Sequence, residues 1–221
     1  MPSVVERFVE RNASAPGTAP RSVRLEQAGE MQLKPGRWLP FVASHEASVE
    51  RVEFSWRATF RLGPVVRVQV RDFYEHGDGG LVVRLWGLVP VMRGVGPAFA
   101  KGEAMRYLAE LPWVPHAIRA NDQLEWRELD AHTVEVATLL SSERAVVQLQ
   151  FDAAGDVVAS SAPARPRMEG KRTVERAFGS RFHDYAEIDG VRVPTAAEAF
   201  WELPEGRFPY FRARVTGVHI D

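Results

Sequence analysis

The feature that most constrains the fold is a long series of short segments in which apolar and polar residues alternate. In residues 23–30, for example, Val23 and Leu25 lie on one side of an extended chain, and Arg24 and Glu26 lie on the other. A period of two is typical of a β-strand with one buried face. Comparable runs follow at residues 38–47, 52–61, 65–74, 81–88, 124–129, 133–140, 145–151, 157–161, 181–188, 191–194, 196–203 and 210–220. The sequence therefore predicts a mainly β protein.

Short turn signals rich in glycine, proline and aspartate separate these segments. They stand at residues 35–36, 77–80, 152–156, 189–190 and 205–206. Short turns join neighbouring antiparallel strands, so the pattern predicts a meander. Open, twisted sheets rarely exceed about ten strands without curling. We therefore expect one large curved antiparallel sheet or half-barrel, an α+β fold in which β-structure dominates.

Two helices interrupt the β pattern. Apolar residues recur at helical spacing in residues 3–12, which predicts a short amphipathic helix followed by a link at residues 13–21. Gly96-Pro97 is a favourable helix start, and Pro112 ends a segment of helical composition, so we expect a central helix over residues 97–111. We interpret residues 162–176, rich in proline and arginine, as a surface loop. The expected organisation is a helix and link over residues 1–20 and one β domain over residues 21–221.

Composition excludes several classes of protein. The net charge of −1 and pI of about 6.6 give no electrostatic basis for binding nucleic acid. The absence of cysteine excludes thiol nucleophiles, thiolate metal sites and disulfides. Charges at Glu6, Arg7 and Glu10 are not typical of a signal peptide, and no apolar run reaches the length of a membrane span. We expect a cytoplasmic protein, and the sequence indicates no oligomeric state.

Familiar catalytic motifs are missing from the sequence. It has no Gly-x-Ser-x-Gly elbow, no phosphate-binding loop and no dinucleotide fingerprint. The six histidines are scattered, and a pairing of His183 with Asp184 has no local support as a metal site. We therefore expect no metal and no cofactor.

The central helix carries a narrow polar stripe. Glu103, Arg106, Tyr107 and Glu110 stand at positions i, i+3, i+4 and i+7, so they share one side of a helix that is otherwise mostly apolar. If the stripe faces a cavity, Arg106 lowers the pKa of the carboxyl group that it pairs with, and burial raises the pKa of the other. Such a pair could act as acid and base. The alternative is an ion-pair ladder on the helix surface, which contributes only tenths of a kcal/mol.

Two further groups of residues are candidates for the site. Trp113 and His116 follow the helix directly, and His116 could exchange protons with a ligand or be an ordinary loop residue. On the strand at residues 65–74, Arg67 and Arg71 share one face and Asp72 follows them. These arginines, with Arg57 on the preceding strand, either bind an anionic ligand on the concave face or lie on a solvated outer face.

Several segments resemble an uncharacterised bacterial family that is known only as a domain of unknown function. They are Leu33-Lys34-Pro35-Gly36 with Trp38, the segment Gly102-Glu103 with Arg106-Tyr107-Leu108-Ala109-Glu110, and Arg181-Phe182 with Asp184-Tyr185. The resemblance covers nearly all of the chain after Val23. That family is similar in fold to the LolA/LppX-type half-barrels, which hold lipid-like molecules in a hollow. The chain departs from those carriers in having no export signal or lipid-attachment cysteine.

Three hypotheses of function follow. The first is a binder of a small apolar or amphipathic molecule, with Arg106 and its flanking glutamates fixing the polar end of the ligand. The second is a cofactor-independent isomerase, cyclase or hydrolase that uses Glu103 or Glu110 as acid and base, assisted by Tyr107 or His116. The third is a structural interaction module, which would follow if the stripe were ordinary surface.

Overall fold

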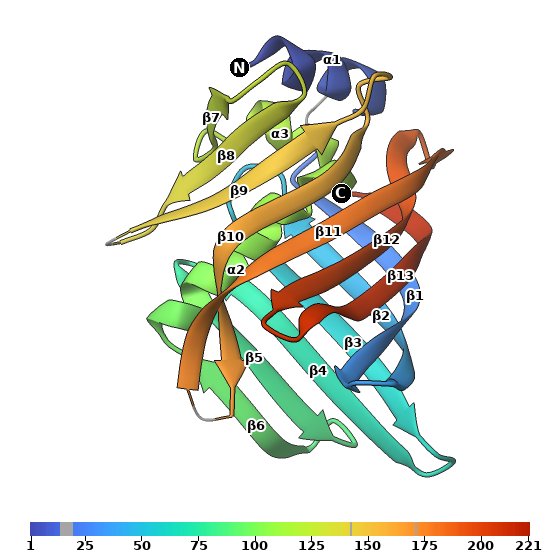
Figure 1. The fold of residues 1–221 in the computed structure, drawn as a ribbon. Helices are drawn as coiled ribbons and strands as arrows, with labels where there is room; N and C mark the ends of the chain where they lie inside the picture. Colours follow the sequence, from blue (N-terminus) through green and yellow to red (C-terminus); the bar gives the residue numbers. More distant parts are fainter. Residues whose placement is uncertain (14–19, 142, 171) are drawn as a thin grey trace.

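The computed structural model describes residues 1–13, 20–141, 143–170 and 172–221, apart from the side chain of residue 33. Most of the expected link, residues 14–19, lies outside this description. Within the described ranges, thirteen strands form one antiparallel sheet in the order β6-β5-β4-β3-β2-β1-β13-β12-β11-β10-β9-β8-β7. The sheet curls into a half-barrel around the central helix (Figure 1). The prediction of a mainly β, curled antiparallel fold is confirmed.

The strands divide into two meanders. The first meander consists of β1 (Ser22–Lys34), β2 (Arg37–Ser48), β3 (Phe54–Leu62), β4 (Val66–Glu75), β5 (Asp78–Leu85) and β6 (Val89–Val95). The second consists of β7 (Glu125–Glu128), β8 (Thr133–Leu139), β9 (Arg144–Phe151), β10 (Val157–Glu169), β11 (Arg172–Ile188), β12 (Val191–Leu203) and β13 (Gly206–Ile220). The first and last strands, β1 and β13, pair and join the meanders.

This topology places the helices. The strands β6 and β7 are opposite edges of the sheet, so the chain between them must cross from one edge to the other. It does so as helix α2 (Pro97–Ala109), the 3₁₀ helix η1 (Leu111–Trp113) and helix α3 (Pro115–Ala120). Helix α2 lies within the curve of the sheet (Figure 1) and packs against β5, β9 and β10. One concave face is therefore covered by one helix whose side chains reach both halves of the sheet.

The structure differs from the prediction in four places. Residues 162–169 and 172–176 are not a loop: they lie in β10 and β11, which pair as a long hairpin despite the prolines of β10. The region 191–203 is one strand, and β6 is a strand that the alternation did not indicate. Pro112 does not stop the helical path, because it occupies an early position of η1, where a missing N–H costs nothing.

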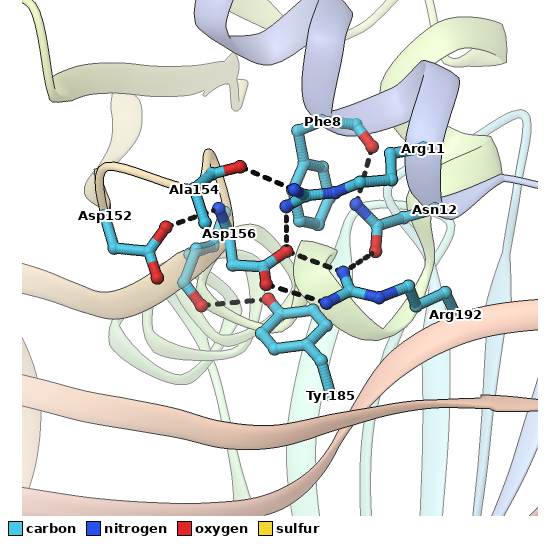
Figure 2. A network of polar contacts seen from close by, with 9 residues as sticks. Phe8, Arg11, Asn12, Asp152, Ala154, Asp156, Tyr185 and Arg192 are labelled. Atoms are coloured by element: carbon cyan, nitrogen blue, oxygen red, sulfur yellow. Dashed lines mark hydrogen bonds and ion pairs between the residues drawn. The ribbon is translucent and has the colours of Figure 1, made fainter.

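Helix α1 (Ser3–Asn12) forms where the periodicity predicts a helix. It closes one end of the half-barrel (Figure 1). A polar network holds it to the sheet (Figure 2). Arg192 donates from both terminal nitrogens to the two carboxylate oxygens of Asp156, at 2.6 and 2.8 Å, and also to the side chain of Asn12 at 2.8 Å. Arg11 of α1 binds the same carboxylate. The ring of Tyr185 lies under Arg192, and its hydroxyl donates to the carbonyl oxygen of Val157.

The contact between α2 and β5 is unusually close. A Cβ atom on Gly79 would lie 2.6 Å from the Cα of Ala100, nearer than side chains approach backbone. Glycine at this position therefore lets the helix backbone rest directly on the strand.

Among the described residues, no helix has the length and apolar character to cross a membrane.

Candidate functional site

A cavity of about 610 Å³ lies between the concave face of the sheet, helix α2 and the β10–β11 hairpin. Most of its wall is apolar. The apolar side chains that line it include Met31, Leu39, Phe60, Leu62, Val68, Val70, Leu81, Val83, Met92, Phe99 and Met168. Three charged groups, Asp72, Glu103 and Arg165, also line both this cavity and a smaller one of about 90 Å³. The charged groups therefore lie where the two hollows meet.

The alternation of strand β4 explains how a carboxylate enters an apolar wall. Val68, Val70 and Asp72 share the concave face and line the cavity, whereas the intervening residues Arg67 and Arg71 point to the outer face. Position 72 is therefore the one place on the concave face of β4 where a charge replaces an apolar side chain.

Arg106 of helix α2 connects two carboxylates. It donates from Nη1 to Oδ2 of Asp72 at 2.6 Å and from Nε to Oε1 of Glu110 at 2.9 Å. The side chains of Arg106, Glu110 and Asp72 are only 13 %, 15 % and 16 % exposed. The guanidinium carbon also lies 5.0 Å from the ring centre of Trp56 and 5.2 Å from that of Phe54. The polar stripe thus faces the interior of the half-barrel.

His45 of strand β2 extends this cluster on the far side of Glu110. Its Nε2 atom lies 3.5 Å from Oε2 of Glu110. Burial lowers the pKa of His45 to about 4; Arg106 acts in the same direction, and Glu110 only partly opposes them. The imidazole is therefore neutral at physiological pH, and its contact with Glu110 is not an ion pair there.

Glu103 is a carboxyl group whose pKa is strongly raised. Burial first, and then the nearby carboxylate of Asp72, raise its pKa to about 8, although Arg106 and Arg165 act against this. Among the described residues, Oε2 of Glu103 and Oδ1 of Asp72 have no hydrogen-bond partner. Burial also raises the pKa of Asp72, opposed chiefly by Arg106. At neutral pH, Glu103 is mainly protonated and can donate a hydrogen bond into the cavity.

Arg165 approaches this cluster from strand β10. It is 7 % exposed, and its Nε donates to the carbonyl oxygen of Gly102 at 3.2 Å. Its guanidinium carbon lies 4.5 Å from the ring centre of Phe178 and 5.4 Å from that of Trp201. The site therefore combines three carboxyl groups with two guanidinium groups in an apolar setting. The proton that Glu103 holds offsets the extra carboxyl group.

The sequence-derived candidates on the helix and beyond it separate in the structure. Glu103, Arg106 and Glu110 are together, and Trp113 lines the smaller cavity while its Nε1 donates to Pro194. The hydroxyl of Tyr107 instead donates to the carbonyl oxygen of Ser48 at 2.8 Å and accepts from Asn121. Tyr107 turns away because it lies about 100° around the helix from Arg106.

Four other candidates lie away from the cavities. His116 is buried in α3, which packs on α1, because Pro115 starts a new helix that turns this side chain from the site. Arg57 and Arg67 are exposed on the outer face of the sheet. Arg71 is on that face too, bonded to Ser55 and Glu75. Of the two alternatives for these arginines, the structure supports the outer face, and of that group only Asp72 lines the cavity.

Sequence reasoning missed His45, Arg165 and Tyr210. His45 stands among the apolar residues of β2 that alternate into the core, so its position on the buried face was available from the pattern. Arg165 was hidden because its segment was interpreted as a loop. Tyr210 lines both cavities from β13, but nothing local separates it from an ordinary strand tyrosine.

Comparison with known proteins gives a family and a fold. A family of unknown function, DUF6920, matches residues 1–219. The chain belongs to this family. The geometry described above is therefore that of a DUF6920 member. No curated protein sequence matches the chain.

Two solved structures are similar to this DUF6920 chain. One is a LolA superfamily protein from Nitrosomonas europaea, with a TM-score of 0.51, 13 % identity, and coverage of 99 % of this chain and 92 % of that one. The other is a β-barrel-like DUF1849 protein from Brucella abortus, with a TM-score of 0.24, 12 % identity, and coverage of 93 % and 100 %. The first shows a LolA-like half-barrel fold, in agreement with the resemblance seen in the sequence.

Among the described residues, no group of three histidine, aspartate or glutamate side chains could hold a metal ion.

Proposed function

We propose that this protein binds a small apolar or amphipathic molecule, with the apolar part in the larger cavity and the polar end against Asp72, Glu103 and Arg165. The observation that carries the proposal is an apolar hollow of about 610 Å³ with charged groups gathered in one part of its wall. Typical small-molecule sites have volumes of about 300–1,000 Å³ and a few convergent polar groups. The LolA-like fold supports the proposal as an analogy of shape.

The polar groups favour a particular kind of ligand head. Glu103 can donate one hydrogen bond, and Oδ1 of Asp72 can accept one. A hydroxyl or amine group satisfies both atoms. A free carboxylate would face two carboxyl groups and would depend mainly on Arg165, because Arg106 is already bonded to Asp72 and Glu110, and Arg167, which also lines the cavity, is bonded to Glu169. The proposal therefore ranks long-chain alcohols and amines above the matching fatty acid.

The test begins with native mass spectrometry of the purified protein, followed by titration with the neutral apolar dye N-phenylnaphthylamine. Unlabelled alcohols, amines and acids of equal chain length then compete with the dye. Val83→Phe fills the cavity and should weaken dye binding by about tenfold or more, equivalent to about 1.4 kcal/mol. The matched control is Val82→Phe, which places the same extra volume on the opposite face of the same strand.

Equal dye affinity in Val83→Phe and the unchanged protein, both shown to be folded by circular dichroism, would contradict binding in this cavity. A preference for the carboxylate competitor would contradict the assignment of the ligand head. Loss of dye binding in Val82→Phe as well would indicate a general effect on folding, and the cavity would then have no special role.

A second candidate function is acid–base catalysis without a cofactor. The specific observation in its favour is that Glu103 has a pKa of about 8, while the adjacent Asp72 is bonded to Arg106. Burial raises the pKa of both carboxyl groups, but of the two only Asp72 accepts a hydrogen bond from Arg106, so the protonated Glu103 could serve as proton donor and Asp72 as proton acceptor. Glu110 is less suited to proton transfer, because one of its oxygens is bonded to Arg106 and the other faces His45.

Catalysis and binding differ in the effect of Glu103→Gln. A catalyst would convert the molecule identified by mass spectrometry, and Glu103→Gln would remove conversion while keeping affinity within a few-fold, since the amide is nearly isosteric. A binder would leave the molecule unchanged in mass and structure after prolonged incubation with the unmodified protein. That second result would exclude the catalytic function for this molecule.

A further inference from the structure

The end of the half-barrel opposite α1 exposes an unusual set of large apolar side chains. Val65 lies in the β3–β4 turn, and Trp86 and Leu88 lie in the β5–β6 turn, which is at the same end of the molecule (Figure 1). Leu88 is 82 % exposed, Val65 73 % and Trp86 53 %. Val89, at the start of β6, is half exposed. We refer to these four residues as the apolar rim.

Hydrogen bonds within and between the two turns hold the apolar rim in a defined conformation. Trp86 and Gly87 have φ angles of +50° and +75°, and the backbone N–H of Leu88 donates to the carbonyl oxygen of Leu85. A bulky residue with a positive φ is a conformation that costs free energy. The indole nitrogen of Trp86 also donates to the carbonyl oxygen of Val65 at 3.2 Å, which joins the two turns. The fold thus holds a tryptophan at an exposed tip.

Arginines flank the rim on the outer face of the same strands. Arg61 pairs in register with Arg67, and Arg84 and Arg93 follow on β5 and β6. All four are exposed, and within the described ranges none of them forms an ion pair. Unpaired arginines beside exposed apolar side chains form a surface that fits an apolar layer covered by negative charge.

The edge strand β6 could in principle add a strand from another protein instead. Two features oppose this. Pro90 is the second residue of β6 and has no N–H to donate. The pairing of β6 with β5 also shifts register between Val83 and Arg84, a bulge that bends the edge. Prolines and bulges are how proteins protect edges from strand addition. The exposed apolar side chains are therefore better suited to a fluid surface.

The larger cavity opens beside this surface. Leu62, Val91, Met92 and Met168 line the cavity and are themselves exposed, and Leu62 and Met92 belong to the strands that carry the rim. An apolar molecule leaving a bilayer at this point would meet these apolar side chains first. We propose that the apolar rim and its four arginines dock this protein on the surface of an anionic lipid bilayer, with the mouth of the cavity turned towards the lipid.

The test is sedimentation of the full chain with vesicles of phosphatidylcholine alone or of an equimolar mixture with phosphatidylglycerol. The protein should bind the anionic vesicles and bind the neutral ones far more weakly. Val65→Ser with Leu88→Ser should reduce binding by about tenfold or more, because two large apolar side chains no longer enter the lipid. Arg67→Gln with Arg84→Gln should lower it by about 25-fold, since each arginine near an anionic surface contributes about fivefold.

Matched controls distinguish this surface from general stickiness. Leu139→Ser changes an equally exposed leucine in β8, away from the rim, and Arg7→Gln changes an exposed arginine in α1 at the other end. Neither should alter vesicle binding, and all variants should keep the unchanged protein's affinity for the cavity dye. Absence of vesicle binding, equal binding to both vesicle types, or equal loss in the controls would overturn the proposal. Self-association abolished by Leu88→Ser, without vesicle binding, would assign the surface to a second copy of the chain and overturn it also.

Discussion

Arg106 on helix α2 and Asp72 on strand β4 are joined by a hydrogen-bonded ion pair of 2.6 Å within the half-barrel. Because Arg106 also binds Glu110, one guanidinium fixes the position of the helix and compensates two largely buried carboxylates. Asp72 and Glu103 both line the cavity, and one oxygen of each is buried without a hydrogen-bond partner among the described residues. The ion pair therefore shapes the site as well as the fold.

Replacing Arg106 with leucine should destabilise the protein by about 3–5 kcal/mol, because two carboxylates remain in an apolar setting without their counter-charge. Chemical denaturation at neutral pH measures this loss. The control is Arg127→Leu, since Arg127 binds Glu135 in a pair whose arginine is 67 % exposed and should contribute little to stability. Similar losses in the two variants would contradict the role assigned to Arg106.

Glu103 should make stability fall as pH rises between about 5 and 8. Its pKa is raised in the folded protein, to about 8, so across this window the folded state holds a proton that the unfolded state has released. The slope that one such proton adds approaches about 1.4 kcal/mol per pH unit. Denaturation curves across this range should show that Glu103→Gln removes this component. An unchanged slope would mean that Glu103 titrates normally.

Asp156 should make stability fall as pH falls, which is the opposite of the effect of Glu103. Partial burial alone would raise its pKa, but the hydrogen bonds and charges of Arg192 and Arg11 lower it below the usual value. This stabilisation is present above the unfolded pKa, about 3.9, and is lost as pH falls through the folded value. Asp156→Asn should cost about 2–4 kcal/mol at pH 7, and the difference should shrink below about pH 4.

The matched control for that experiment is Asp184→Asn. Asp184 lies 3.5 Å from Arg214, and both side chains are more than half exposed. This change should have little effect on stability at either pH. If both variants lost the same stability, the network that holds α1 to the sheet would have no special contribution.

Two glycines near the cavity should respond in opposite ways to alanine. Gly79→Ala places a methyl group 2.6 Å from the Cα of Ala100 and should destabilise the protein by about 1–3 kcal/mol, because backbone must move. Gly102→Ala lies inside α2, where the nearest atom would be 3.6 Å away, and should stabilise it by up to about 1 kcal/mol. Thermal denaturation of both variants checks the direction. Equal destabilisation would contradict the close contact of α2 with β5.

The sequence by itself determined the local structure where two signals agreed. Residues 3–12 are helical as predicted, and Gly96-Pro97 starts the central helix. The turn at Asp189-Gly190 joins β11 and β12 with positive φ at both residues, as their chemistry favours. Where one signal misled, the prediction failed: the prolines of residues 162–176 suggested a loop, but they lie in a hairpin whose strands extend over the helix.

For the site, the spacing of Glu103, Arg106 and Glu110 was enough to place them on one side of a helix, because helical geometry is local. Whether a face of β4 lines a cavity was not a local property. Alternation indicates that the valine face of β4 is the buried one, but that this face, with Asp72, lines a cavity follows from how the sheet curls around α2.

The tertiary structure alone decided which residues meet. His45 comes from β2, Asp72 from β4 and Arg165 from β10, and no spacing in the sequence relates them. They lie together because the chain between the two sheet edges must cross the concave face, bringing α2 against strands of both halves. Burial among these strands then sets the acidity of Glu103, which depends on surrounding atoms and not on neighbouring sequence.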